Sequence, residues 1–250
     1  MSRFQRIILI GAIATALPFS FFTTAVATWI AIGIALAVTA LLAYGSIATN
    51  SGVLAPVRSR SADGSLLLTY DDGPDPRATP ALLDLLREHR VRAHFFLVGE
   101  RVDRHPELAR RIVEEGHDVG SHSQAHSRWT NFFFAGQLSR EIERSQTAIE
   151  RATGRRALHY RPPHGLLNHA TGPVASRLDL EIVGWTIRSF DTGRRSTEQI
   201  VTRVARRLRP GAIILLHDGG QDPERVVAIT RGILDAIDRR GLHTRGTASH

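Results

Sequence analysis

An uncharged apolar stretch at the N-terminus constrains this chain more than any other feature of its sequence. No charged residue lies between Arg6 and Arg58, and residues 7–47 consist mainly of Ile, Leu, Ala, Val and Phe. A soluble domain does not expose a continuous apolar surface of that extent. One membrane span needs about 20 apolar residues, so a stretch of roughly twice that length suits two helices with Pro18 in the turn between them. The sequence therefore predicts a transmembrane helical hairpin within residues 1–47.

The arginines around this stretch predict which side of the membrane the rest of the chain occupies. Arg3 and Arg6 precede the stretch, Arg58 and Arg60 follow it, and the turn has no basic residue. Cytoplasmic segments next to membrane spans are enriched in Lys and Arg, which favours an inner-membrane protein of a bacterium with its folded domain in the cytoplasm. The alternative is a signal peptide or single anchor whose basic region contains Arg3 and Arg6, which would export the domain.

The remainder of the chain divides into a linker, one domain and a tail. Residues 48–64 are rich in small, polar and turn-forming residues and are expected to form the linker. Residues 65–243 are expected to form a single domain, which at roughly 180 residues is large enough to build its own core. Residues 244–250 form a short tail with no recognisable pattern.

Composition limits the chemistry available to this domain. The chain has no cysteine, so a metal ion would have to be bound by His, Asp or Glu. The net charge is +8 and all the Lys and Arg positions are Arg, but the arginines of residues 87–92, 104–111 and 203–209 alternate with apolar positions, which is typical of solvated helix faces. Only 6% of residues are aromatic. A nucleic-acid surface would need a basic stripe with stacking aromatic side chains, so no nucleic-acid partner is expected.

Short apolar runs alternate with amphipathic helical patterns along residues 65–243. This order predicts an α/β domain with a parallel sheet. The expected strands are residues 65–70, 93–98, 117–121, 157–161, 181–186 and 211–217, and the expected helices are residues 79–89, 106–116, 136–154, 169–178, 196–208 and 223–241.

Polar clusters follow five of the expected strands. In parallel α/β folds, functional side chains gather at the carboxyl ends of the strands, so these clusters are expected to meet at one edge of the sheet. They are residues 70–76, 122–126, 161–165, 185–191 and 217–218.

Carboxylates and histidines in these clusters suit metal-assisted hydrolysis. His122 and His126 are four residues apart, the spacing that places two imidazoles on one face of a helical turn, and with Asp72 they form a two-His, one-carboxylate set with open positions. A divalent cation bound there would acidify water and polarise a carbonyl group, while Asp71 removes the proton from the attacking water. His217 is placed to protonate the departing amine. Taken singly, the Asp pair also suits a turn, and the His pair also suits a surface or core position.

The motifs together resemble those of the polysaccharide deacetylase family, whose catalytic module is the NodB homology domain, also called carbohydrate esterase family 4. The resemblance covers roughly residues 65–243 and implies a distorted, incomplete (β/α) barrel. Five motifs occur in the order found in the family, at residues 69–73, 122–126, 161–165, 185–191 and 215–218.

The resemblance also implies roles for individual residues. It assigns Asp71 as the base, His217 as the acid, and Asp72, His122 and His126 as metal ligands. It further implies that Arg161 orients Asp71, that Asp191 tunes His217, and that the backbone amide of His164 stabilises the oxyanion. Substrate-binding positions in the matching motifs are Pro162, His164, Trp185, Arg188 and Leu215, of which Trp185 and Leu215 would shape a pocket for the acyl methyl group.

Four positions depart from the usual family pattern. Tyr70 replaces a common Phe, His164 stands where an aromatic residue such as Tyr is usual, Arg188 occupies a position that is usually acidic, and Thr192 replaces a Trp. The Tyr70 replacement is conservative. Each departure is expected to affect the choice of substrate more than the reaction, and the sugar-binding wall is expected to differ from that of the family. Because Arg188 and His164 are expected at the same cleft, we hypothesise an anionic feature on the substrate, such as the phosphate of a lipid carrier.

The sequence thus predicts a metal-dependent hydrolase that removes an N-acyl group, acetyl or formyl, from an amino sugar. The expected cofactor is Zn²⁺, with Co²⁺ or Ni²⁺ as alternatives. A cytoplasmic domain would act on a lipid-linked saccharide, and an exported one on peptidoglycan or another glycan. Two alternative functions remain open, which are a catalytically inactive carbohydrate-binding relative and a metal amidohydrolase of a non-sugar amide.

Overall fold

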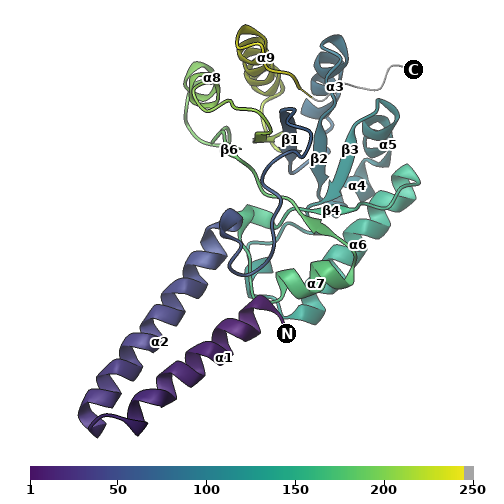
Figure 1. Ribbon diagram of the computed structural model, residues 1–250. Helices are drawn as coiled ribbons and strands as arrows, with labels where there is room; N and C mark the ends of the chain where they lie inside the picture. The colour runs from purple at the N-terminus through teal and green to yellow at the C-terminus, as the bar shows by residue number, and fades with distance from the viewer. Residues whose placement is uncertain (245–250) are drawn as a thin grey trace.

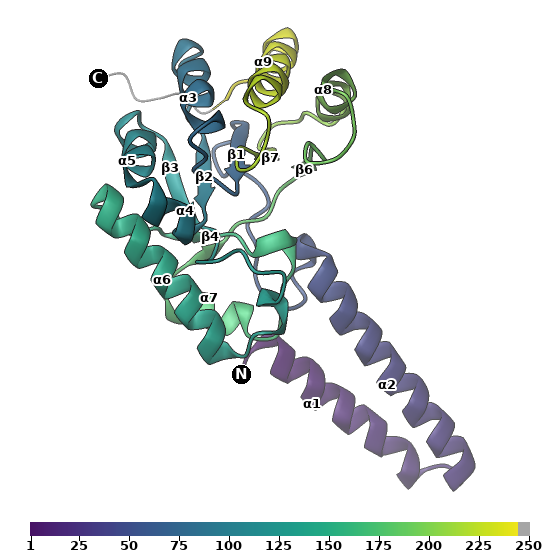
Figure 2. The same ribbon diagram turned by 180° about the vertical axis from the view of Figure 1, so that it is seen from behind.

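The computed structural model describes residues 1–244 and has two parts, a pair of N-terminal helices and an α/β domain. Helices α1 (Arg3–Ala16) and α2 (Thr24–Ile47) lie side by side and project together from one side of the domain (Figures 1 and 2). The short 3₁₀ segment η1 (Leu17–Ser20), which contains Pro18, connects them. All of the expected tail except residue 244 lies outside the described residues.

The domain is built on a curled, wholly parallel sheet of seven strands in the order β5-β4-β3-β2-β1-β7-β6. The sequence prediction of an α/β domain with a parallel sheet is confirmed. The strands are β1 (Leu67–Asp71), β2 (His94–Leu97), β3 (Asp118–Ser121), β4 (His159–Tyr160), β5 (Glu181–Ile182), β6 (Ile187–Arg188) and β7 (Ile213–His217).

Helices cover the sheet and bury its central strands, as the apolar character of β1, β2 and β7 requires. One apolar core lies between these strands and helices α3, α5 and α9, and a second lies under α6 and α7. The helices of the domain are α3 (Ala78–Glu88), α4 (Gly99–Arg104), α5 (Pro106–Glu114), α6 (Ala135–Thr153), α7 (Thr171–Arg177), α8 (Thr197–Ala205) and α9 (Pro223–Arg239).

The sequence predicted the central strands better than those at the sheet edges. Strands expected at residues 157–161 and 181–186 are reduced to the two-residue strands β4 and β5, because only a few of their backbone groups find a neighbour. Strand β6 was not predicted, since it lies inside the polar motif at 185–191. Helix α4 was also missed, because its six residues are too few to display a helical period.

Residues 48–64 do more than connect the helices to the domain. Arg58 forms a parallel bridge with Val183, and Arg60 forms an antiparallel bridge with Ala212. The buried hydroxyl of Thr49 donates a hydrogen bond to the carbonyl oxygen of Gly165. The segment expected to be a linker is therefore packed along the edge of the domain and contacts the 161–165 motif.

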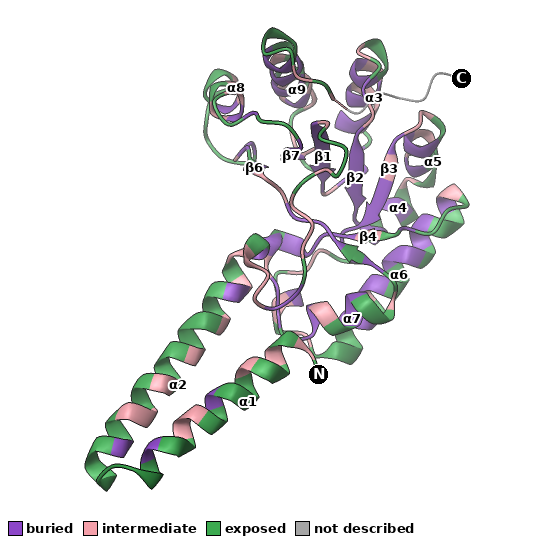
Figure 3. Cartoon of the chain, in the orientation of Figure 1, coloured by how far each residue is buried: buried purple, intermediate pink, exposed green. Residues whose placement is uncertain are grey.

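Helix α2 is exposed along most of its apolar surface, whereas the core helices bury one face (Figure 3). Within residues 1–244, it is the one helix that is long and apolar enough to cross a membrane. Helix α1 has 14 residues and packs closely on α2, where a Cβ at Gly11 would lie 2.8 Å from Val38. About 20 residues are needed for a span, so α1 alone is shorter than the predicted first arm of the hairpin.

Candidate active site

The carboxyl ends of strands β1, β3, β4 and β7 bring the sequence motifs to one cavity of about 330 Å³. Asp71 ends β1 and pairs in register with His217, which ends β7. The motifs after β3 and β4 supply the other polar side chains. The cavity is lined by Asp71, Asp72, His122, His126, His164, Gly165, Trp185, Arg188, Phe190, Thr192, Leu215 and His217.

Asp72, His122 and His126 form a compact group of possible metal ligands. One ligand atom from each lies within 4.8 Å of the others. The Oδ1 atom of Asp72 is 3.4 Å from Nε2 of His122 and 3.1 Å from Nε2 of His126. That oxygen is buried and has no hydrogen bond of good geometry. A buried carboxylate oxygen is expected to have a partner, and a cation between these three side chains would supply one.

The two histidines reach this position on a loop rather than on a helical turn, which corrects the expected geometry. Residues 122–126 follow β3 without helical structure, and Ser123 and His126 have positive φ angles of 64° and 49°. Asp72 also has a positive φ, of 71°. Backbone of this kind is strained in residues other than Gly and is concentrated at functional sites. The spacing alone identified the histidine pair, but the helical turn predicted for it was wrong.

Hydrogen bonds and neighbouring charges determine the tautomer of His122 and the pKa values of His122 and His126. Nδ1 of His122 lies 2.7 Å from the carbonyl oxygen of Arg161, so it carries the proton and leaves Nε2 facing Asp72. Burial opposes protonation of His122, but the charges of Asp71 and Asp72 raise its pKa. Burial and the neighbouring His122 lower the pKa of His126 to about 4. Asp71 and Asp72 therefore favour positive charge beside His122. His126 is neutral at neutral pH and has a free lone pair on its ring.

Burial disfavours the ionised form of Asp72, but the close approach of His122 and the charges of the nearby histidines outweigh it and hold the pKa of Asp72 below its usual value. Asp72 is thus a carboxylate at neutral pH. A carboxylate with two imidazoles is a donor set that divalent transition metals accept.

Arg161 is fully buried and fixes the neighbouring carboxylate, Asp71. Its Nη1 donates to Oδ1 of Asp71 at 2.7 Å and to the hydroxyl of Thr69 at 2.8 Å. Its other donors reach the carbonyl oxygens of Val183 and Gly184. The guanidinium carbon also lies 4.0 Å from the ring centroid of Phe96. These contacts fix the planar guanidinium group of Arg161. Asp71 is therefore held with its Oδ2 directed toward His122.

His217, at the end of β7 and in register with Asp71, is paired with Asp191. Nδ1 of His217 lies 2.8 Å from Oδ1 of Asp191, and its backbone NH donates to Oδ2 at 2.8 Å. Ser189 donates to the same carboxylate at 2.8 Å. Burial alone would lower the pKa of His217, but the hydrogen bond and charge of Asp191, with the charges of Asp71 and Asp72, raise it to about 9. His217 is therefore a protonated acid at neutral pH.

The expected substrate-binding residues divide into three kinds of position. Leu215 and Trp185 line the cavity near the strand ends, and a Cβ at Gly165 would meet the Trp185 ring at 2.3 Å. His164 and Arg188 are exposed and also line it, with the His164 ring 4.6 Å from that of His126. Pro162 is buried and lies outside the cavity lining.

Sequence reasoning missed several residues that shape this site. Ser189 orients Asp191, and Thr69 shares Arg161 with Asp71. Phe190 lines the cavity with a φ of 61°, and Asn50 donates to the carbonyl oxygen of Trp185. Ser189 and Phe190 lie inside the recognised motif at residues 185–191, and this position could have indicated that they belong to the site. Asn50 lies in the presumed linker, where nothing in the sequence indicates a contact 135 residues away.

Comparison with known proteins places this arrangement among enzymes of one family. A family model described as polysaccharide deacetylase matches residues 58–183. The chain is 35% identical over 178 residues to a peptidoglycan-N-acetylglucosamine deacetylase of Bacillus cereus, covering 70% of this chain and 83% of the relative. It is 39% identical over 196 residues to a chitooligosaccharide deacetylase of Rhizobium leguminosarum bv. trifolii, covering 74% and 91%.

A solved structure shares the fold. A family 4 carbohydrate esterase from Streptomyces lividans, in complex with acetate, matches with a TM-score of 0.67 and 35% identity. The match covers 73% of this chain and 92% of the esterase. The curled parallel sheet with its helices is thus the half-barrel that the sequence resemblance implied.

Proposed function

The chain belongs to the polysaccharide deacetylase family, and from this premise we propose that it is a carbohydrate N-deacetylase, a hydrolase that cleaves the C–N bond between an acyl group and an amino sugar. The observation that carries the proposal is the convergence of Asp71, His217 and a three-ligand group on one cavity. Its named relatives act on peptidoglycan and chitooligosaccharides. Both substrates carry N-acetyl amino sugars, which is the substrate class proposed here.

We assign the divalent cation to Asp72, His122 and His126, because Oδ1 of Asp72 is a buried oxygen without a hydrogen bond between two imidazole nitrogens. When bound, the cation would polarise the amide carbonyl and lower the pKa of a water molecule. Zn²⁺ suits this donor set, and Co²⁺ or Ni²⁺ are the alternatives.

Two other residues move the protons. Asp71 takes the proton of the water whose oxygen attacks the amide carbon, and Arg161 keeps its carboxylate in the required orientation. His217 then gives its proton to the nitrogen as the C–N bond breaks, which releases a carboxylate and the free amine of the sugar. Asp191 keeps His217 protonated until that step. The backbone amide of His164 is proposed to stabilise the negative charge that develops on the carbonyl oxygen.

Leu215 and Trp185 are proposed to enclose the acyl group. Both line the cavity, and Gly165 leaves no room between its own backbone and the Trp185 ring. A pocket bounded so closely favours a small acyl group, acetyl or formyl. Pro162 is proposed to fix the backbone conformation of the 161–165 motif, since its side chain is buried and does not line the cavity.

We further propose that α2, with α1 packed on it, anchors the domain at residues 65–243 to a membrane. The exposed apolar surface of α2 supports this proposal. The basic residues at both ends of the helix pair favour a cytoplasmic domain and a lipid-linked saccharide as substrate. Export of the domain would instead favour peptidoglycan.

The function is tested with full-length protein in detergent, loaded with zinc. Acetate and formate release is measured from a panel of N-acetyl and N-formyl saccharides that includes peptidoglycan fragments, chitooligosaccharides and lipid-linked amino sugars. We expect release from at least one class, and none from the zinc-free protein. Silence across the panel, with zinc shown to be bound, would contradict the proposal and favour a binding role or a non-sugar amide.

The side of the membrane is tested separately by thiol labelling. Because the chain has no cysteine, single cysteines at Ser20 in the turn and Glu150 on α6 are the only reactive thiols. Both positions are exposed. With intact cells and a membrane-impermeant maleimide, we expect the cysteine at position 20 to react and the one at position 150 to be protected. The reverse pattern would mean that the domain is exported.

A further inference from the structure

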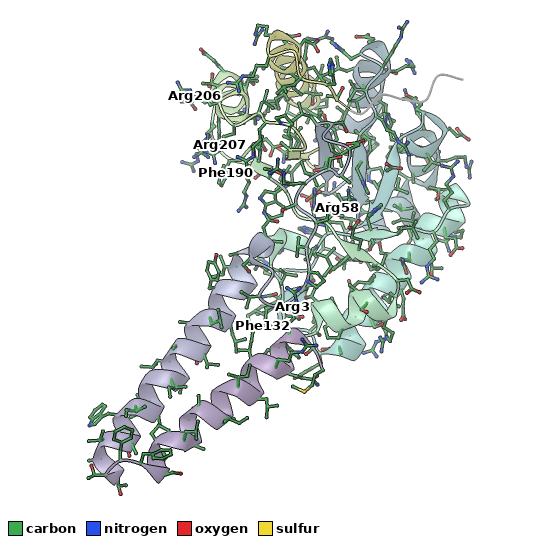
Figure 4. The ribbon with its side chains drawn as sticks, viewed as in Figure 1. Arg3, Arg58, Phe132, Phe190, Arg206 and Arg207 are labelled. Atoms are coloured by element: carbon green, nitrogen blue, oxygen red, sulfur yellow. The ribbon has the colours of Figure 1, made fainter. Side chains whose placement is uncertain are left out.

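Three arginines surround Phe190 at the rim of the cavity. The guanidinium carbons of Arg188, Arg195 and Arg203 lie 4.9, 5.0 and 4.5 Å from the ring centroid of Phe190. Arg188 and Phe190 also line the cavity that contains the catalytic pair. The arginine cluster therefore adjoins the active-site cavity, and Figure 4 shows Phe190 below Arg206 and Arg207.

No carboxylate neutralises these arginines within residues 1–244. None of the three forms an ion pair, although most arginines around α3 and α5 do. Burial, with the positive charges of Arg207 and Arg195, lowers the pKa of Arg203. Like charges held together without a counterion are unfavourable by themselves, so a bound anion would stabilise them.

The structure also holds the arginines in place. Nε of Arg203 donates to the backbone carbonyl of Arg188 at 3.0 Å. Arg225 on α9 donates to the carbonyl oxygens of Asp191, Gly193 and Arg195, the last at 2.6 Å. The loop that carries Arg195 is thus fixed to α9 before any ligand arrives. A site whose groups are already ordered binds its ligand at a smaller entropic cost.

We propose that Arg188, Arg195 and Arg203 form a subsite for a phosphate ester on the substrate, next to the sugar that is deacylated. This inference rests on the proposed function and names its substrate class. Arginine suits the role because its planar fork binds phosphate oxygens through paired hydrogen bonds. The phosphate can belong to a soluble sugar phosphate or to a lipid-linked sugar.

Binding is measured first, because it does not depend on turnover. N-acetylglucosamine 1-phosphate is titrated calorimetrically into the zinc-loaded full-length protein and into Arg195→Gln/Arg203→Gln. We expect the double variant to bind at least tenfold more weakly. Arg206→Gln is the matched control, since Arg206 directly follows α8, whereas the guanidinium groups over the Phe190 ring in the described part of the chain are those of Arg188, Arg195 and Arg203. Equal affinity in the double variant, or an equal loss in the control, would overturn the proposal.

Turnover then distinguishes the sources of the phosphate. The ratio of kcat/KM for N-acetylglucosamine 1-phosphate to that for N-acetylglucosamine should fall at least tenfold in the double variant. A polyprenyl-phosphate-linked N-acetylglucosamine preferred over the soluble phosphate identifies a lipid-linked substrate, and the opposite preference identifies a soluble one. Failure of these three and of the rest of the saccharide panel to release acetate or formate would contradict the proposed function, while the calorimetric result would still decide the subsite.

A second inference comes from the loop that follows the metal-ligand motif. Trp129, Phe132 and Phe134 are 63%, 73% and 73% exposed, an unusual cluster of aromatic side chains in water. Nδ2 of Asn131 in the same loop donates to the hydroxyl of Ser46 at 3.2 Å. The loop therefore lies level with the domain end of α2, and Figure 4 places Phe132 beside the base of the helix pair.

We infer that this aromatic loop, residues 129–134, inserts into the lipid interface next to α2. Trp and Phe are favourable at this depth, and Tyr44, which is exposed near the end of α2, lies at the same level. The inference rests on the proposed membrane anchor. Since Trp129 follows His126 by three residues, a loop held at the lipid surface would keep the metal-ligand group close to that surface.

Fluorescent labels on single cysteines test the depth of the loop in vesicles of phosphatidylcholine and phosphatidylglycerol, with quencher on the lipid chains. Gly33→Cys reports on α2, where added side-chain atoms meet nothing within 4 Å. Phe132→Cys reports on the loop, and Leu158→Cys, at another exposed apolar position, is the control. We expect quenching at positions 33 and 132 and none at 158. Quenching at 33 without quenching at 132 would overturn the loop proposal, and none at 33 would overturn the anchor.

Discussion

The two sides of the cavity are built in different ways. On the side formed by β1, β3 and β4, the acidic and basic side chains are buried and held by protein partners, as with Arg161 and Asp71. On the side formed by residues 185–195, Asp191 is buried beside His217, but the arginines are exposed and carry positive charge, as with Arg188 and Arg195. Departures from the usual family pattern occur on both sides, at Tyr70 and His164 on the first and at Arg188 and Thr192 on the second. We propose that the buried residues of both sides perform the reaction and that the exposed arginines select the substrate.

The largest effect is expected from the metal-ligand group on the buried side. In His126→Ala, zinc should bind more than about 100-fold more weakly, because loss of even an outer-shell partner costs about 10- to 100-fold. Competition with a chromogenic chelator measures the affinity. His164→Ala is the control, since its ring lies 4.6 Å from that of His126 but is outside the three-ligand group. An equal loss of zinc affinity in His126→Ala and His164→Ala would contradict the assignment of His126 as a metal ligand and of His164 as a residue of the cavity wall.

A smaller effect is expected at the proton donor, which joins the two sides. Asp191→Asn removes the charge that raises the pKa of His217 toward 9, so the imidazole should lose its proton at lower pH. A charge-assisted hydrogen bond contributes about 1.5–3 kcal/mol, which corresponds to roughly one to two pH units. The alkaline limb of the pH–rate profile should therefore move down by that amount, with activity retained at lower pH. An unmoved limb would show that His217 is not the acid.

The smallest effect is expected where the wall meets the acyl pocket. Gly165 and Gly154 both have a φ of +69°, but a Cβ at Gly165 meets the Trp185 ring at 2.3 Å, whereas one at Gly154 meets nothing within 4 Å. Alanine at either position should lower the free energy of unfolding by about 1–2 kcal/mol. Only Gly165→Ala should also raise KM, by several-fold. Thermal unfolding and steady-state kinetics measure the two quantities, and equal KM values would argue against Trp185 as a pocket wall.

The sequence predicted the side formed by β1, β3 and β4 better than the side formed by residues 185–195. The motifs located Asp71, Asp72, His122, His126 and His217, because strand ends in a parallel sheet meet at one edge. They did not predict the left-handed backbone at residues 72, 123 and 126, which depends on surrounding packing rather than on local propensity.

The exposed side was predicted less well for a physical reason. Arg188 was placed at the cleft, but Arg203 was interpreted as part of a solvated helix face, and Arg195 was assigned no role. Their contact with Phe190 depends on how α8 folds back over β6, which has no periodic signal in sequence. The contact of Asn50 with the 185–191 motif likewise joins segments far apart in the chain.

The most direct test of the division between reaction and selection is the zinc-loaded Asp71→Asn variant compared with wild type. Zinc content and acetate release from the same N-acetyl saccharide are measured on both proteins. Because Asp71 is assigned to proton removal and not to the metal, the variant should keep one zinc per chain and lose activity by about 10²- to 10⁴-fold. Acetate release at the wild-type rate with zinc bound would contradict the account.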